Sequence, residues 1–148
     1  MRVAAYRRVS AQDIEQATSV ALLARSCEER IRRCRRYKFA GYYFDEGDSR
    51  AGFEKLMEAA ESGQIDRIET RSAFEFIENV GDLIQTASRL NNLNPPVRIH
   101  FENEGITTGT AEWERCVYFL MGFLESACRH SAKNCQCLKP KEESLCRI

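Results

Sequence analysis

The chain has 148 residues, and its 22 lysines and arginines match its 22 aspartates and glutamates, so the formal net charge is zero. This length suits one domain with a substantial core. The neutral balance excludes a chain-wide electrostatic attraction to nucleic acid. No apolar stretch is long enough for a signal peptide or a membrane span, so we expect a cytoplasmic protein without membrane association. The seven cysteines are then expected to be reduced thiols.

The first ten residues combine a buried strand with polar side chains at its end. Residues 3–6 form an unbroken apolar run, which is typical of a strand covered on both faces of a parallel sheet. Arg8 and Ser10 follow directly. Ligands of open α/β sheets bind beyond the carboxyl ends of the strands, so this pair is a candidate site. The alternative is a serine in an ordinary loop between a strand and a helix.

Apolar spacing predicts one long helix over residues 12–36, with a strongly basic far end. That end could contact phosphates. A solvated helix end, stabilised by the helix dipole, explains the charges as well. We favour the solvated end because no aromatic residues are interspersed among the arginines.

Strands and helices alternate through the middle of the chain. We expect strands at 39–44, 65–70 and 97–101, helices at 50–62 and 79–93, and a polar loop at 45–49. This order predicts a three-layer α/β/α domain with a mostly parallel central sheet. The third strand is unusual for a central strand because Arg67 and Glu69 fall on one face.

A last helix is expected over residues 110–133, and it carries two apolar stripes. One stripe is Trp113, Val117, Leu120 and Leu124, and the other contains Phe119 and Phe123. A helix on the outside of a three-layer domain needs one apolar stripe, so two stripes indicate burial on two sides. We therefore expect a long C-terminal dimerisation helix and a homodimer or higher homo-oligomer. The alternative is a helix buried wholly within one core.

The sequence changes character near its end. We place one domain at 1–134 and a polar tail at 135–148, with no DNA-binding domain in the chain. Cys135, Cys137 and Cys146 have irregular spacing and no nearby pair of histidines, which matches structural zinc sites poorly. We expect neither a metal nor another cofactor.

Five short motifs resemble one known family in the family's own order. They are Tyr6-x-Arg8-Val9-Ser10, Asp45-Glu-Gly-Asp-Ser49, Arg50-Ala-Gly-Phe53, Glu61-Ser-Gly-Gln-Ile-Asp66 and Phe101-Glu-Asn-Glu-Gly-Ile106. Together they span roughly residues 1–134, and they are similar to motifs of the serine recombinases, the resolvase and invertase family with its large-integrase branch. Each motif is weak alone, but five in order are specific.

The resemblance implies a resolvase-like fold and a metal-free reaction on DNA. A serine attacks a phosphodiester and forms a phosphoserine link that later reverses, while arginines stabilise the phosphoryl charge. Ser10 matches the nucleophile and Arg8 the arginine beside it. The matches to supporting positions are Asp45, Ser49, Arg50 and Asp66. Without a downstream DNA-binding domain, DNA binding is expected to be weak and sensitive to salt.

The sequence then departs from the family. Where members resemble Lys-Ser-x-Ser-Arg-Phe-x-Arg-Asn, this chain reads Arg71-Ser-Ala-Phe-Glu-Phe-Ile-Glu-Asn79. Glu75 and Glu78 therefore replace two arginines, and Phe74 replaces a small polar residue. Two unit charges about 5 Å apart interact by roughly 3 kcal/mol at an effective dielectric constant of 20, so each reversal opposes phosphate by about 6 kcal/mol before screening. Weak or absent catalysis is expected.

Three hypotheses follow from these residues. The first is a serine recombinase catalytic domain with impaired activity. The second is a non-catalytic recombinase-like module for dimerisation or regulation. The third is a flavodoxin-like or receiver-like binding domain, whose Asp45 loop would hold an ion or phosphate.

The acidic substitutions also predict local ion pairs. Opposite charges in a partly dry crevice are expected to pair, because leaving either unpaired is more costly. We therefore expect Glu75 or Glu78 to form a salt bridge with Arg8, Arg50 or Arg71.

Overall fold

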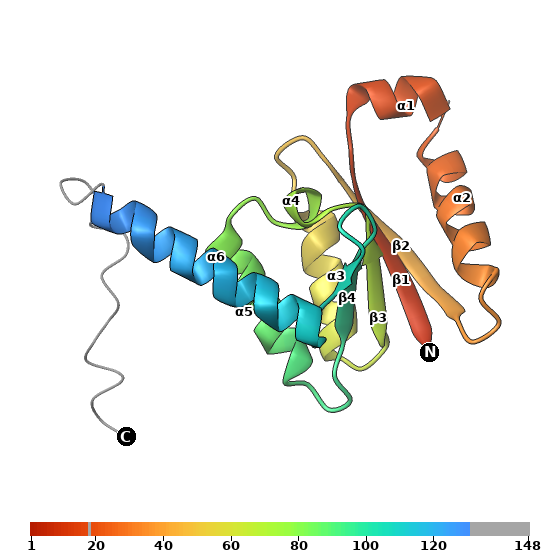
Figure 1. The fold of residues 1–148 in the computed structure, drawn as a ribbon. Coiled ribbons are helices and arrows are strands. Elements are labelled where there is room, and N and C mark those ends of the chain that lie inside the picture. The colour runs from red at the N-terminus through yellow and green to blue at the C-terminus, as the bar shows by residue number, and fades with distance from the viewer. Residues whose placement is uncertain (18, 131–148) are drawn as a thin grey trace. The chain divides into compact units, whose positions relative to one another are not determined.

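The computed structural model describes residues 1–17 and 19–130, drawn in colour in Figure 1. They divide into a first unit, Met1–Trp113, and a second unit that begins at Glu114. The first unit contains a five-stranded sheet covered by helices. The second contains most of the last helix.

The sheet is mostly parallel, as the sequence predicts. Its strands are β1 (Arg2–Val9), β2 (Lys38–Glu46), β3 (Arg67–Thr70), β4 (Arg98–Phe101) and β5 (Ile106–Thr107). They lie in the order β2-β1-β3-β4-β5, and β5 alone runs antiparallel to its neighbour within the described sheet. Because β1 lies between β2 and β3, its carboxyl end lies between theirs.

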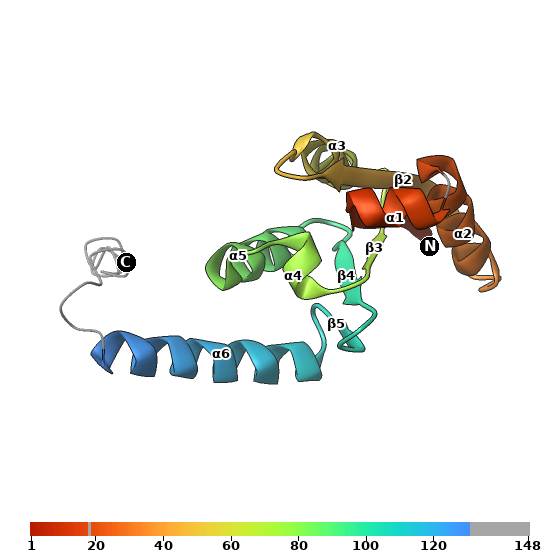
Figure 2. The same ribbon diagram turned by 90° about the horizontal axis from the view of Figure 1, so that it is seen from above.

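Helices cover both faces of this sheet. One face carries α2 (Val20–Arg32), and the other carries α3 (Ala51–Glu61), α4 (Ala73–Phe76) and α5 (Val80–Asn91). Figure 2 shows α2 and the α3–α5 group on opposite sides of the strands. This confirms the three-layer α/β/α arrangement.

The single helix expected over residues 12–36 is wrong. The structure has α1 (Ala11–Ala17) and then α2, whose first turn is capped by Ser19. Ser19 has extended backbone angles, and its hydroxyl accepts a hydrogen bond from the Leu22 N–H at 3.3 Å. A serine that caps a helix terminus in this way starts a new helix, and apolar periodicity does not reveal such a break.

The main core lies between the sheet and the α3–α5 group. Tyr6 is fully buried there and packs edge-to-face on Phe53 and Phe76, with ring centroids 5.9 and 5.7 Å away. At the far side of this core Phe101 contacts Trp113, with ring centroids 6.0 Å apart. A smaller cluster, Val3, Ala5, Cys27 and Ile31, fills the space under α2.

The unusual charges of β3 form their own ion pair. Arg67 Nε donates to Glu69 Oε1 at 2.6 Å, and both side chains are mostly buried. The guanidinium also lies over the Tyr37 ring. Mutual neutralisation on one face explains how a central parallel strand tolerates both residues.

A β-bulge at Gly41 changes the register of β2 against β1. Val3 pairs with Phe39, but Ala4 pairs with Gly41, so one residue of β2 is unmatched. Gly41 has a φ of 145°, a value that L side chains rarely adopt. Because side chains alternate along a strand, the extra residue reverses which face each later residue of β2 occupies.

The last helix, α6 (Ala111–His130), begins in the first unit and continues through the second. Tyr118 and Phe119 lie exposed on it. Phe123 and Leu124 fall outside the part of the structure whose side chains are described, and the predicted tail at 135–148 lies outside it altogether. Among the described residues, no helix is both long and apolar enough to span a membrane.

Gly52 permits a close contact between α3 and β2, which generates the first prediction. A Cβ at this position would lie 2.1 Å from the Phe44 carbonyl oxygen. Gly52→Ala must therefore push α3 away from the strand, and we expect a loss of about 3 kcal/mol in the free energy of unfolding. Urea denaturation followed by circular dichroism measures this.

The matched control is Gly122→Ala in α6, where no atom lies within 4 Å of the added Cβ. That variant is expected to be neutral or slightly stabilising, because alanine favours a helix interior. Equal stability of Gly52→Ala and the parent chain would show that α3 does not depend on this contact.

Candidate active site

Ser10 lies exposed at the carboxyl end of β1, where it caps α1. Its N–H and its hydroxyl both donate to Asp13 Oδ2, at 2.9 and 2.7 Å, and the Asp13 N–H donates back to Ser10 Oγ at 3.2 Å. The two hydrogen bonds from Ser10, with a smaller contribution from Arg71, lower the pKa of Asp13. The serine hydroxyl is therefore held against a carboxylate. Asp13 was not predicted, although a Ser-x-x-Asp spacing before a helix is the usual signal of this reciprocal cap.

Glu75 and Glu78 both form ion pairs with arginines, which confirms the expectation. Arg8 Nη1 donates to Glu78 Oε1 at 2.8 Å, and Arg71 Nη1 donates to Glu75 Oε1 at 3.4 Å. The Glu78 side chain is 80 % exposed and that of Arg71 is 44 % exposed. Each pair is therefore worth no more than about 1 kcal/mol. The neighbouring Phe74 points its ring into solvent.

The ion pair satisfies only one of the two carboxylate oxygens of Glu75. Its second carboxylate oxygen is buried and has no hydrogen-bond partner among the described residues. An unpartnered buried oxygen of this kind costs free energy. The negative charge of Glu75 is therefore only partly compensated in the folded protein.

Asp45 is a buried carboxylate that joins three elements. It is 2 % exposed and accepts a hydrogen bond from the Tyr6 hydroxyl at 2.8 Å. It also accepts the N–H groups of Gly52 and Phe53, at 2.7 and 2.9 Å, in the first turn of α3. Burial, and then the bond to Asp45, raise the pKa of Tyr6. Asp45 thus supports the site without being open to it.

Ser49 and Arg50 directly precede α3, and Arg50 is its N-cap residue. The Arg50 guanidinium donates to the Phe76 carbonyl oxygen at 3.2 Å and lies over the Phe53 ring, 4.0 Å from its centroid. These contacts direct Arg50 toward the end of α4, just before the segment that carries Glu78. Ser49 is exposed.

Asp66 does not lie with the other candidates. It accepts hydrogen bonds from the Arg2 backbone N–H and from the Arg2 guanidinium, at 2.7 to 3.1 Å. These residues are at the amino ends of β1 and β3, whereas Ser10 is at the carboxyl end of β1. A strand rises about 3.3 Å per residue, so the two places are roughly 26 Å apart. Asp66 directly precedes β3, where the sequence places it. The family match groups it with the site residues, but this position is at the end of the sheet opposite Ser10.

Sequence reasoning also missed a second set of charges near Ser10. Arg7 is 5 % exposed, and Arg7 Nη2 donates to Glu102 Oε1 at 2.9 Å. Arg30, from the basic end of α2, donates to the same carboxylate. The one available signal was a charge that directly follows a buried apolar run. Among residues 1–17 and 19–130, no three His, Cys, Asp or Glu side chains group closely enough to hold a metal ion.

The arrangement at the end of β1 comprises an ordered serine hydroxyl, several arginines and carboxylates that partly neutralise them. The family described as "Resolvase, N terminal domain" matches residues 3–135, which is most of the chain. The chain belongs to the resolvase family of serine recombinases. No curated protein sequence matches it.

Solved structures of resolvase-family domains share the fold. The N-terminal catalytic domain of TP901-1 integrase superposes with a TM-score of 0.65 at 18 % identity, over 88 % of this chain and 99 % of that one. A resolvase family site-specific recombinase from Streptococcus pneumoniae gives 0.67 at 21 % identity, over 89 % and 93 %. The C-terminal catalytic domain of ISC1926 TnpA, an IS607-like serine recombinase, gives 0.51 at 16 % identity, over 99 % and 93 %.

The Arg2–Asp66 pair generates a prediction about pH. The bonds from the Arg2 side chain lower the pKa of Asp66 to about 2, whereas an aspartate in an unfolded chain has a pKa of about 3.9. A carboxyl with a depressed pKa in the folded state stabilises the protein above its unfolded pKa. That stabilisation is lost as the pH falls through the folded value.

We therefore expect Asp66→Asn to lower the free energy of unfolding at pH 7, and the difference from the parent chain to shrink between about pH 4 and pH 2. Urea denaturation across this range measures it, with Asp48→Asn at an exposed turn residue as the control. A difference that stays constant with pH would contradict this role of the pair.

Proposed function

We propose that this chain is a serine recombinase catalytic domain whose DNA strand cleavage is impaired by its own carboxylates. Two contacts support this most directly, between Arg8 and Glu78 and between Arg71 and Glu75. In the family pattern that residues 71–79 resemble, the positions of both glutamates carry arginines. Here each of these positions supplies a negative charge that binds a neighbouring arginine instead of a DNA phosphate.

The size of the electrostatic repulsion predicts a large loss in the rate of DNA strand cleavage. The ion pairs themselves are weak because they are exposed, and a phosphate could displace them. The displaced carboxylates would nevertheless remain near the phosphoryl group, where repulsion replaces the attraction of an arginine. At roughly 3 kcal/mol per charge pair about 5 Å apart, two reversals correspond to many powers of ten in rate, even after screening.

The remaining parts of the site are consistent with attack by serine. Ser10 is exposed, and its hydroxyl donates a hydrogen bond to the carboxylate of Asp13 at 2.7 Å. Arg8 comes from the same strand, two residues earlier. The serine recombinase reaction would need a DNA phosphate between these groups, held by arginines that are not already neutralised.

A non-catalytic module for dimerisation or regulation is the second candidate, and α6 favours it. Tyr118, Phe119 and Met121 are exposed in this helix. Exposed aromatic side chains on one helix are typical of interaction surfaces. Trp113, by contrast, packs on Phe101 in the core of the first unit, so it contributes less to such a surface.

The receiver-like hypothesis has little support. It needs a carboxylate at Asp45 that is open to an ion, but three hydrogen bonds already use the oxygens of that residue.

The proposed impairment is tested by trapping the phosphoserine link. The parent chain, incubated with recombination-site DNA, is expected to give little or no covalent protein–DNA adduct on denaturing gels. Glu75→Arg with Glu78→Arg should bind duplex DNA at least about tenfold more tightly, because two charge reversals add phosphate contacts, and binding should become more sensitive to salt. Fluorescence anisotropy at several salt concentrations measures both effects.

Ser10→Ala in both backgrounds is the control for the chemistry. Any adduct must disappear with it. A strong Ser10-dependent adduct from the parent chain would overturn the proposed impairment, whereas no gain in DNA affinity in the double variant would show that the glutamates do not oppose phosphate.

Self-association is expected through the exposed side of α6. Phe119→Ala should weaken a homodimer about tenfold or more, since a buried aromatic anchor at an interface is worth over 1 kcal/mol. Phe74→Ala is the matched control, because the two rings are 72 % and 70 % exposed. Sedimentation equilibrium measures the dissociation constant, and a parent chain that stays monomeric at high micromolar concentration would contradict the prediction.

A further inference from the structure

Side-chain alternation in β1 sends Arg7 and Arg8 to opposite faces of the sheet. Tyr6 lies in the core with the α3–α5 group, whereas Val3 and Ala5 lie under α2. Arg7 shares the face of Val3 and Ala5. It is therefore on the α2 side of the sheet.

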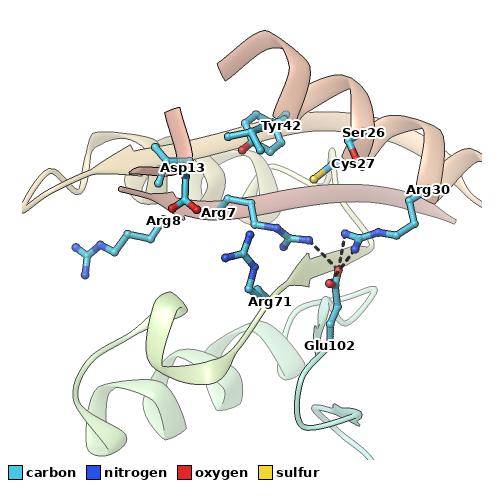
Figure 3. Close-up of a pocket in the computed structure, with 11 residues that line it drawn as sticks. Arg7, Arg8, Asp13, Ser26, Cys27, Arg30, Tyr42, Arg71 and Glu102 are labelled. Carbon is cyan, nitrogen blue, oxygen red and sulfur yellow. Dashed lines mark hydrogen bonds and ion pairs between the residues drawn. The ribbon is translucent and has the colours of Figure 1, made fainter. Parts of the chain in front are cut away.

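On this face two arginines share one carboxylate. Arg7 Nη2 donates to Glu102 Oε1 at 2.9 Å, and Arg30 donates to both oxygens of Glu102, at 2.6 and 3.0 Å. Figure 3 shows both guanidinium groups converging on this single carboxylate. One negative charge therefore serves two positive ones.

A pocket of about 130 Å³ lies beside this cluster, and Arg8 and Arg71 also line it. Figure 3 shows the Arg71 guanidinium directed toward Arg7. Of the residues that line the pocket, four are arginines and two, Asp13 and Glu102, are carboxylates. The lining thus carries a formal charge of +2.

Carboxylates outside the lining reduce this charge only in part. Glu78, the partner of Arg8, is 80 % exposed, so water screens it strongly. Glu75 contacts Arg71 at 3.4 Å, the long end of the hydrogen-bond range. Within the lining, Asp13 already accepts two hydrogen bonds from Ser10.

Tyr42 supplies a second and independent observation. Tyr42 lines the pocket, and its hydroxyl is buried and has no hydrogen-bond partner among the described residues. Burial is the main cause that raises the pKa of Tyr42 to about 12, so the hydroxyl keeps its proton at neutral pH. A buried donor without an acceptor is costly, and an acceptor in the pocket would remove that cost.

The size of the pocket limits what the acceptor can be. A volume of about 130 Å³ holds roughly four waters at about 30 Å³ each. Pockets for drug-sized ligands and cofactors usually enclose at least about 300 Å³. We propose that this pocket binds one phosphate-type oxyanion, held by the guanidinium groups of Arg7 and Arg71 with Tyr42 donating to it. Forked guanidinium donors match the oxygens of such an anion.

Calorimetric titration of the full chain with sodium phosphate, at ionic strength kept constant with sodium chloride, tests this. Saturable binding with a dissociation constant in the millimolar range is expected, and Arg71→Gln should weaken it about tenfold, as the loss of one charge-assisted hydrogen bond predicts. Tyr42→Phe should weaken it about threefold while leaving the fold intact, because the hydroxyl has no partner to lose. Arg25→Gln, an exposed α2 arginine outside the pocket, should change nothing.

Two further titrations identify the source of the anion. If the pocket accepts the phosphate group at the end of a larger molecule, methyl phosphate should bind as tightly as phosphate. If the pocket takes free phosphate alone, methyl phosphate should not bind. Both results support an oxyanion site. Duplex DNA without terminal phosphates should not displace phosphate, and displacement would overturn a site separate from DNA.

Absence of saturable phosphate binding would also overturn the proposal, as would equal affinity in Arg71→Gln, Tyr42→Phe and the parent chain. The proposed recombinase impairment is tested separately, by the Ser10-dependent adduct and by the Glu75 and Glu78 variants. Ser10, Glu75 and Glu78 do not line this pocket, although their partners Asp13, Arg71 and Arg8 do.

Discussion

The buried carboxylate of Asp45 is the interaction on which the end of the sheet depends. It receives the Tyr6 hydroxyl from β1 and two N–H groups from the first turn of α3, so one side chain joins the central strand, its neighbour and the following helix. Buried carboxylates are tolerated when hydrogen bonds replace their hydration. The close approach at Gly52 brings the helix terminus near enough for these bonds.

This junction fixes the positions of Arg8 and Ser10. Tyr6 is clamped by Asp45 and by the Phe53 and Phe76 rings, and the two site residues follow it on the same strand. A rigid strand end suits a site in which a hydroxyl and a guanidinium must face one phosphate. The glutamates, by contrast, come from a short helix and an adjoining segment, where substitution changes charge without disturbing the junction.

The sequence predicted those parts of the fold that rest on hydrophobic pattern. The buried run at 3–6, the alternation of strands and helices and the family motifs led to the correct architecture. The break at Ser19 was missed because one hydroxyl bond, not periodicity, ends α1 and starts α2. Short β5 was missed because a strand of two residues carries little local signal. The four-residue α4 was missed although Ser72 caps it locally, with its hydroxyl accepting the Glu75 N–H.

Pairing of Glu75 and Glu78 with arginines was predictable because charge and sequence position together implied it. The position of Asp66 at the start of β3 was also predictable, and because β1 and β3 are parallel it lies at the sheet end opposite Ser10. Only the family match grouped it with the site residues. The cluster of Arg7, Arg30 and Glu102 brings together residues from three separate elements. Only the folded sheet shows that they converge.

The bulge at Gly41 gives β2 two roles that a regular strand could not combine. Before it, Phe39 faces α2; after it, the even-numbered Tyr42 faces α2 as well, while Tyr43 turns to the main core. The same shift directs Asp45 to Tyr6. The inserted residue therefore reverses the alternation of side chains in the rest of β2. Its deletion would exchange the side chains that face α2 with those that face the main core. One bulge thus positions both Asp45 at the junction and Tyr42 at the pocket.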